Sequence, residues 1–229
     1  MRRIEALCLD AGGTLVWPNW ARVSAALAGE GVHVDASALA AADPRVRRSF
    51  DEAHVIAATT DQRRGWTYFE TILETAGVAP SDGVQRALTA LAEYQRTTNL
   101  WEVVPAFVPE TLIKLRRLGC KLAVVSNANG TVRQAFHRLG LSALVDVVVD
   151  SGEEGVEKPD PRLFEIALTR VGSTADRALH AGDIYHVDVV GARSAGLEAI
   201  LVDEANLYPD VDCRRIASIA ELPELVRGR

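Results

Sequence analysis

Residues 4–16 read I-E-A-L-C-L-D-A-G-G-T-L-V, an apolar run that ends in one carboxylate, Asp10, and turns through Gly12 and Gly13. A short apolar run before glycines predicts a buried strand that gives way to a tight turn. Because ligands of an open α/β sheet bind beyond the carboxyl ends of its strands, Asp10 is predicted to lie at such a site. A single Asp at a strand end is more often a turn former or helix cap, so the prediction depends on residues further along the chain.

From Pro105 onward, short apolar runs alternate with helical patterns. Repeated strand–helix units of this length indicate a parallel sheet with right-handed crossovers. The predicted fold class is therefore α/β, a doubly wound parallel-sheet (Rossmann-like) core. Strands are predicted at 122–125, 145–149, 178–181, 199–202 and near 216–219, and helices at 109–119, 131–139, 161–171, 187–195 and from 221.

Residues 17 to about 96 contain helical patterns and no convincing strand. Their aromatic and apolar stripes predict an all-helical domain inserted into the core. We place the core domain at 1–16 and 104–229 and the helical domain at 17–103. Arginines of this insert are candidates for meeting an anionic substrate, although each is more often part of a solvated helix face: Arg45, Arg47, Arg48, Arg63 and Arg64.

The composition excludes several functional classes. The net charge is −6, which argues against nucleic acid or an anionic membrane as a partner. No apolar stretch approaches the length of a membrane span, and Glu5 and Asp10 interrupt the N-terminal apolar run too early for a signal peptide. Three scattered cysteines, Cys8, Cys120 and Cys213, form no disulfide framework or zinc pattern. We expect a cytoplasmic protein, whose oligomeric state the sequence leaves open.

Polar side chains follow successive predicted strands. Ser126 and Asn127 follow the second strand, Lys158 lies in the loop after the third, and Asp183 and Asp188 follow the fourth. The strand ends therefore bring together three carboxylates, counting Asp10, with one ammonium and one hydroxyl group. Each residue alone has an ordinary structural explanation, but their occurrence at successive strand ends favours a site.

The chemistry of this set predicts a metal-assisted phosphoryl site. Three uncompensated carboxylates would repel one another by several kcal/mol at an effective dielectric constant of about 20. Mg²⁺ relieves such repulsion, because it takes carboxylates together with phosphate oxygens as ligands. Lys158 would balance remaining negative charge, and the Ser126 hydroxyl could hold phosphoryl oxygens. A positioned carboxylate can also act as a nucleophile through an aspartyl-phosphate intermediate.

With these motifs the sequence resembles the haloacid dehalogenase superfamily. The family's four motifs correspond to D-A-G-G-T at residues 10–14, Ser126, Lys158-Pro159 and G-D-I-Y-H-V-D at residues 182–188. The helical insert looks like the family's C1-type cap. The resemblance implies that Asp10 is the nucleophile and that Ser126, Asn127 and Lys158 bind the phosphorylated substrate. It implies further that Asp10, the carbonyl of Gly12 and Asp183 bind Mg²⁺, with Asp188 supporting the metal.

Gly12 departs from the family pattern. The family's phosphatases usually carry a second Asp at this position as the general acid for the leaving alcohol, and such an acid contributes roughly 10²- to 10⁴-fold in rate. Candidates to replace it are His186, Glu52 and His54. If the Gly-Gly turn needs a positive φ at Gly12, an Asp there would cost about 1–2 kcal/mol.

Three functions remain open at this point. The first is a Mg²⁺-dependent phosphohydrolase that acts on a small phosphorylated metabolite and favours good leaving groups such as acyl phosphates. The second is a catalytically weak or inactive member that binds a ligand or partner. The third, a 2-haloacid dehalogenase, is disfavoured because Asp183 and Asp188 are both present and make sense mainly with a bound cation.

Overall fold

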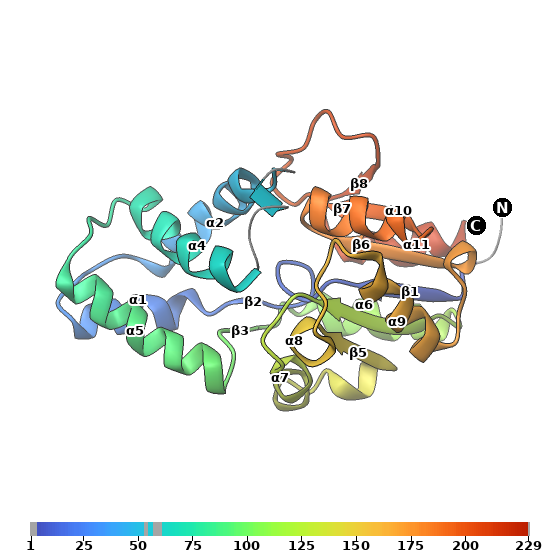
Figure 1. The fold of residues 1–229 in the computed structure, drawn as a ribbon, viewed down its shortest axis with the longest axis horizontal. Coiled ribbons are helices and arrows are strands. Elements are labelled where there is room, and N and C mark those ends of the chain that lie inside the picture. The colour runs from blue at the N-terminus through green and yellow to red at the C-terminus, as the bar shows by residue number, and fades with distance from the viewer. Residues whose placement is uncertain (1–3, 53–54, 57–60, 229) are drawn as a thin grey trace.

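A computed structural model describes residues 4–52, 55–56 and 61–228, with the side chains of 61–64 left out (Figure 1). Strands and helices alternate around one sheet, and a group of helices lies to one side of it. Among the described residues, no helix is both long and apolar enough to cross a lipid bilayer.

The sheet has six strands in the order β5-β4-β1-β6-β7-β8, and every neighbouring pair is parallel. This arrangement confirms the predicted α/β class. The strands span β1 (Ala6–Leu9), β4 (Lys121–Ser126), β5 (Val147–Asp150), β6 (Ala178–Gly182), β7 (Glu198–Val202) and β8 (Arg214–Ile216).

Strand β1 lies at the centre of the sheet and is buried along its whole length. Leu7 and Leu9 belong to the hydrophobic cluster on one face, and Ala6 and Cys8 belong to the cluster on the other. Because successive side chains of a strand point to opposite faces, a run that is apolar at every position suits a strand covered on both sides. The strand ends directly before Asp10, so the sheet fixes the position of this residue.

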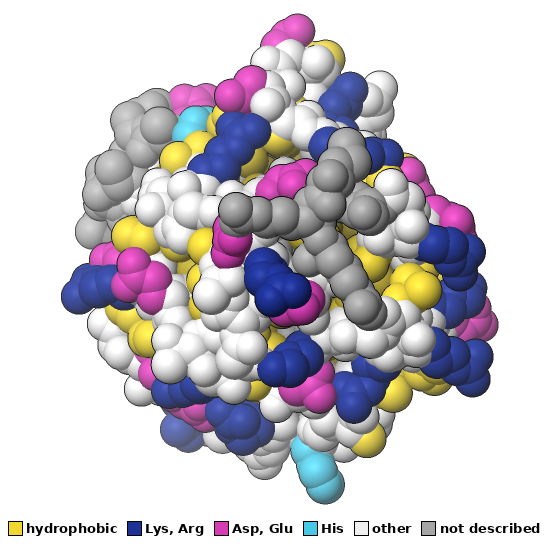
Figure 2. Space-filling model, turned by 90° about the vertical axis from the view of Figure 1, so that its right-hand side faces the viewer, with side chains coloured by type: hydrophobic (Ala, Val, Ile, Leu, Met, Phe, Trp, Pro, Cys, Tyr) yellow, Lys and Arg dark blue, Asp and Glu magenta, His cyan; other side chains and the backbone are white. Residues whose placement is uncertain are grey.

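Helices cover both faces of the sheet. Residues of α6, α7 and α11 pack into the cluster that contains Leu7, and residues of α9 and α10 pack into the cluster that contains Cys8. Figure 2 views one end of the molecule, where basic and acidic side chains are interspersed. The helices span α6 (Phe107–Arg117), α7 (Val132–Arg138), α8 (Ser151–Glu154), α9 (Pro161–Val171), α10 (Val190–Ser194) and α11 (Leu222–Arg227), with short helical turns η1 (Ser142–Leu144), η2 (Ala175–Arg177), η3 (Tyr185–Val189, a π-helix) and η4 (Ile219–Glu221).

The helical insert comprises α1 (Trp20–Gly29), α2 (Ala36–Phe50), α4 (Asp61–Thr75) and α5 (Asp82–Thr97). Its apolar side chains form a hydrophobic cluster separate from those of the sheet. The chain enters and leaves the insert through a two-stranded antiparallel ribbon of β2 (Trp17–Pro18) and β3 (Trp101–Val103). Figure 1 shows the insert to the left of the sheet, joined to it by this ribbon.

Local signals placed most elements within a few residues of their observed bounds. Asp160 caps α9 by accepting a hydrogen bond from the backbone N–H of Arg162, and Ser81 caps α5 in the same way from Val84. Three predicted elements begin or lie at other residues in the structure. The helix expected to open at Pro109 begins at Phe107, the helix expected from 187 begins as the π-helix η3, and the strand expected near 216–219 lies at Arg214–Ile216.

Candidate active site

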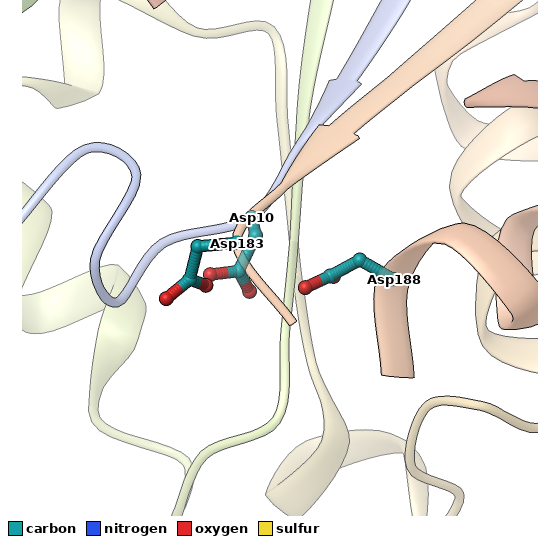
Figure 3. Close-up of side chains that lie close together, drawn as sticks. All are labelled: Asp10, Asp183 and Asp188. Carbon is teal, nitrogen blue, oxygen red and sulfur yellow. The ribbon is translucent and has the colours of Figure 1, made fainter. Parts of the chain in front are cut away.

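Three carboxylates meet at the carboxyl edge of the sheet. Asp10 follows β1, Asp183 follows β6, and Asp188 lies in η3. All three are buried, and each offers an oxygen within 4.8 Å of the other two. Figure 3 shows the side chains converging from the two strand ends and from the helical turn. The structure thus brings together the three acidic residues that the sequence motifs singled out.

Lys158 supplies the positive charge beside this cluster. Its side chain is fully buried, and its Nζ lies 2.5 Å from Oδ1 of Asp10 and 2.7 Å from Oδ1 of Asp188. Asn127 forms two hydrogen bonds with the backbone of Lys158. Its Nδ2 donates to the carbonyl of Lys158 at 2.8 Å, and its Oδ1 accepts from the N–H of Lys158 at 2.7 Å. Asn127 therefore positions Lys158, a contact that the motif did not indicate.

Asp188 is held by further donors. Its Oδ2 accepts from the backbone N–H of Ile184 at 3.0 Å, and its Oδ1 lies 3.0 Å from Nε2 of the buried His180. Burial alone would raise the pKa of Asp188, but Lys158 and His180 together lower it below the ordinary value. Burial lowers the pKa of His180, against the effect of Asp188.

The other two carboxylates differ from Asp188 in their electrostatics. Burial raises the pKa of Asp10 to about 8, an effect opposed by Lys158 and reinforced by its acidic neighbours. Burial likewise raises the pKa of Asp183 to about 6, although Arg47 opposes the shift. Burial is the largest cause of both shifts, and the neighbouring carboxylates add to it.

The donor set fits a hard divalent cation such as Mg²⁺. Asp10, Asp183 and Asp188 offer only oxygen ligands, they are buried, and their oxygens are close enough to share one ion. Asp10 and Asp183 would hold the ion directly. Asp188 is already engaged by Lys158, His180 and a backbone N–H, so its contribution would be to orient the neighbouring groups.

Arg47 of the insert reaches this cluster. Its Nη1 forms an ion pair with Oδ2 of Asp183, and its Nε lies 2.7 Å from Oδ1 of Asp43. The same Asp43 oxygen accepts a hydrogen bond of 2.6 Å from the hydroxyl of Tyr68. Of the arginines considered from sequence, Arg45 is exposed, Arg48 lies over the ring of Tyr208, and the side chains of Arg63 and Arg64 lie outside the described part of the chain.

Gly13 makes room for this guanidinium. Its φ is 76°, and a Cβ at this position would collide with Nη1 of Arg47 and with Oδ2 of Asp183. The left-handed backbone therefore falls on Gly13 and not on Gly12, so the backbone strain considered for an Asp at position 12 does not arise. A side chain at position 12 meets a different obstacle, since its Cβ would lie 3.0 Å from Nε1 of Trp101.

A cavity of about 910 Å³ lies at the carboxyl edge of the sheet and is lined by Asp10, Asp183 and Asp188. It is bounded by the strand ends on one side and by the helical insert on the other. Ser126, Asn127 and Lys158 line it together with Asp10, so all the residues predicted from the motifs meet at one place. The insert contributes a group of aromatic side chains from α2 and α4, Phe50, Trp66, Tyr68 and Phe69, and a set of polar and charged ones, among them Arg47, Thr89, Glu93 and Gln95.

Asp51, just beyond α2, is a second contact between the insert and the sheet. It is buried and accepts hydrogen bonds from the backbone N–H groups of Tyr185 and His186 at 2.8 and 2.9 Å and from the hydroxyl of Tyr208 at 2.6 Å. Nδ1 of His186 also lies 2.9 Å from Asp51. His186 and Glu52 are not among the described residues that line the cavity, and His54 lies outside the described residues.

Sequence motifs did not identify Asp43, Asp51, Tyr68 or Trp101 as part of this region. All four belong to the insert or its connecting ribbon, and they reach the site through tertiary contacts. An Asp-Arg-Asp series spaced four residues apart, at 43, 47 and 51, was the available signal, because residues four apart share one face of a helix.

Comparison with known proteins agrees with this geometry. The sequence profile of the haloacid dehalogenase-like hydrolase family matches residues 4–196. A ribulose-1,5-bisphosphate 5-phosphatase of Halopiger xanaduensis is 34% identical over 146 residues, which cover 63% of this chain and 60% of that protein. A phosphoserine phosphatase of Thermus thermophilus is 34% identical over 158 residues, which cover 69% of this chain and 61% of that protein. The similarity thus spans about 60% of the length of these two relatives.

The same fold is found among solved structures. A putative HAD-hydrolase of Bacillus subtilis, whose crystal structure contains magnesium, superimposes with a TM-score of 0.73 at 17% identity. The alignment covers 98% of this chain and 99% of the other. At this level of identity the likeness shows a shared fold.

Proposed function

The chain belongs to the haloacid dehalogenase-like hydrolase family, and from this premise we propose that it is a Mg²⁺-dependent phosphohydrolase acting on a small phosphorylated metabolite. One observation carries the proposal: the Lys158 ammonium bridges Asp10 and Asp188 inside a cluster of three buried carboxylates, at the floor of a cavity large enough for a metabolite. The phosphatases similar to this chain add support, since both act on phosphate esters of small molecules by name.

In this proposal Asp10 is the nucleophile. Its carboxylate attacks phosphorus, the bond to the leaving oxygen breaks, and an aspartyl phosphate forms, which water then hydrolyses to phosphate and free Asp10. Lys158 neutralises charge on the nucleophile and on the phosphoryl group, and Ser126 holds a phosphoryl oxygen. Asn127 acts mainly by fixing the backbone of Lys158.

The metal would be held by Asp10, Asp183 and the Gly12 carbonyl, with Asp188 supporting the site. When bound, Mg²⁺ supplies positive charge to the phosphoryl oxygens and offsets repulsion between the substrate and Asp10. The charges of the chain itself favour binding of a cation, because Arg47 and Lys158 supply only two positive charges to the three clustered carboxylates.

The helical insert would act as a C1-type cap. It covers the cavity, and two of its residues, Arg47 and Asp51, bind the segment that follows β6. We place the cap domain at 17–103 and the core domain at 1–16 and 104–229. A cap of this kind selects the substrate by the side chains that it presents to the cavity and excludes water when closed.

A small panel of substrates tests the proposed function. We expect phosphate release from 4-nitrophenyl phosphate and acetyl phosphate that requires Mg²⁺, and no halide release from 2-haloacids. Halide release without metal would favour the dehalogenase alternative. Failure to release phosphate from any ester, with Mg²⁺ binding intact, would favour an inactive binding protein.

The metal ligands are tested by calorimetric titration. Asp183→Asn should bind Mg²⁺ much more weakly than the native protein and lose Mg²⁺-dependent phosphate release while remaining folded. Asp210→Asn, at an exposed position, is the matched control and should bind Mg²⁺ normally. Undiminished affinity in Asp183→Asn would remove Asp183 from the metal site.

A further inference from the structure

The indole ring of Trp101 occupies the space next to Gly12. A Cβ built on Gly12 would lie 3.0 Å from Nε1 and 3.2 Å from Cδ1 of this ring. The nitrogen edge of the indole is therefore nearest to the position two residues after Asp10, and both Gly12 and Trp101 line the cavity. A side chain at position 12 would project to the place where Nε1 now lies.

Trp101 is fixed by contacts on several sides. Its backbone pairs with Pro18 across the β2–β3 ribbon, and its backbone N–H donates to Oδ1 of Asn99 at 2.9 Å. Its ring stacks on Tyr68 at 6.2 Å between centroids and meets the edge of Phe69 at 5.7 Å. These contacts hold the indole in one orientation beside Gly12.

The indole N–H donates a hydrogen bond and accepts none. It cannot act as a proton source at neutral pH, because its conjugate base is a very strong base. Within the described part of the chain, no hydrogen bond from Nε1 to a protein acceptor is formed. A donor fixed in advance beside the place where negative charge develops stabilises the transition state. Trp101 has this property beside Gly12, two residues after Asp10.

Other groups lining the cavity are poor proton donors. The Tyr68 hydroxyl already donates to Asp43, and burial together with Asp43 raises its pKa well above the ordinary value. Arg47 is bound to Asp183 and Asp43. Glu93 is largely exposed and paired with Arg96. The Lys158 ammonium lies between Asp10 and Asp188. The donor that lies next to Gly12 is the indole N–H of Trp101.

From this geometry we propose that the Trp101 indole N–H donates a hydrogen bond to the leaving-group oxygen and that the substrates are phosphate monoesters of phenol-type alcohols. The inference rests on the proposed phosphohydrolase function. Asp10 attacks phosphorus, the phosphorus–oxygen bond breaks, and its electron pair stays on the aryl oxygen. The phenolate then departs unprotonated and takes its proton from water.

The walls of the cavity suit such a leaving group. Trp66, Tyr68 and Phe69 of α4 and Phe136 of α7 line it, and Trp101 lies between the insert and the sheet. Aromatic side chains bind planar rings through stacked and edge-to-face contacts and remove apolar area from water. A phenyl ring fits this lining better than the small polar leaving group of an acyl phosphate.

Kinetics on a series of substituted phenyl phosphates and alkyl phosphates tests the proposal. In the native enzyme kcat/KM should fall steeply as the leaving group becomes more basic, and alkyl phosphates should be poor substrates. Trp101→Phe keeps an aromatic ring and removes the N–H. We expect it to lower kcat/KM for phenyl phosphate by about 10- to 100-fold, the range of one hydrogen bond to a charged group, and to steepen the dependence on leaving-group basicity.

Trp17→Phe is the matched control, because Trp17 lies on the same ribbon but packs on Phe107 and is not among the described cavity residues. In Trp17→Phe, the dependence of kcat/KM on leaving-group basicity should have the same slope as in the native enzyme. An unchanged slope in Trp101→Phe, or native alkyl phosphate turnover as efficient as aryl turnover, would overturn the proposal. No turnover of any ester would instead count against the proposed function.

A binding measurement decides the inference even without turnover. Asp10→Asn cannot form the aspartyl phosphate, and Mg²⁺ is added in large excess because the substitution weakens a metal ligand. Phenyl phosphate should shift the ¹⁵N–¹H resonance of the Trp101 indole in this variant downfield, because the N–H gains an acceptor. The resonance is assigned by its loss in Trp101→Phe. A resonance that does not move at saturating phenyl phosphate, or no binding of phenyl phosphate at all, would overturn the proposal.

Discussion

The guanidinium of Arg47 lies against the carboxylate of Asp183, so a residue of the helical insert touches one of the three clustered carboxylates directly. Asp43, one helical turn earlier on α2, holds the other side of the guanidinium. A residue of the insert and a metal ion would therefore use the same carboxylate, and the position of α2 would be linked to occupation of the metal site.

Replacing Arg47 should strengthen Mg²⁺ binding. In Arg47→Met the competing cation is removed from Asp183, and the dissociation constant measured by calorimetry should fall about tenfold, within the range of one charge-assisted interaction. Arg47→Lys should lie between Arg47→Met and the native protein.

Arg48→Met is the control for this experiment. Arg48 follows Arg47 in α2 and lies over the ring of Tyr208, at 4.7 Å from its centroid, with no contact to Asp183 among the described residues. Its Mg²⁺ affinity should equal that of the native protein. Weaker or unchanged binding in Arg47→Met would show that the ion pair does not compete with the metal.

Removing the Asp51 carboxylate should loosen the insert from the segment after β6. Asp51→Ala leaves the N–H groups of Tyr185 and His186 and the Tyr208 hydroxyl without their acceptor. We expect the free energy of unfolding to fall by about 1–3 kcal/mol and the amides of Tyr185 and His186 to exchange faster with deuterium. Tyr208→Phe removes only one of these hydrogen bonds and should cause the smaller loss. Native exchange rates at both amides in Asp51→Ala would contradict this account of how the insert is held.

Restoring an acid at position 12 should require a change at Trp101 as well. The φ of Gly12 is not positive, so an Asp there meets no strain of the left-handed kind, but its Cβ would press on the indole at 3.0 Å. Gly12→Asp alone should gain little alkyl phosphatase activity. The double variant Gly12→Asp with Trp101→Leu should gain up to the roughly 10²- to 10⁴-fold that a general acid provides. An equal gain of alkyl phosphatase activity in Gly12→Asp alone would show that the Trp101 indole can move aside without an energetic cost.

The sequence was informative where function depends on strand ends. Asp10, Ser126 and Asp183 lie at or just beyond the ends of β1, β4 and β6, and Lys158 lies in the loop that follows β5 and α8. A parallel sheet brings such ends to one edge. The site at the carboxyl edge follows from this rule, whereas the order of the strands, β5-β4-β1-β6-β7-β8, is seen only in the structure. Small displacements, such as the start of α6 at Phe107, reflect the loose coupling between local signals and helix ends.

The contribution of the insert could not be predicted in the same way. Helical periodicity indicates which face of a helix is apolar, but it does not say against which loop that helix packs. Arg47 was one of five candidate arginines, and only its ion pair with Asp183 distinguishes it from Arg45 or Arg48. The assignment of the left-handed turn to Gly13 also needed the backbone, because either glycine could have carried it.

The central claim is that Asp10 carries the phosphoryl group during turnover, and trapping that group tests the claim most directly. The native enzyme and Asp10→Asn would each be mixed with Mg²⁺ and 4-nitrophenyl phosphate, quenched with acid within one turnover, digested and analysed by mass spectrometry. We predict a phosphorylated peptide containing Asp10 in the native enzyme only, formed with a burst of 4-nitrophenol. Mg²⁺-dependent phosphate release by Asp10→Asn at the native rate, or turnover with the phosphoryl group on another residue, would contradict the account.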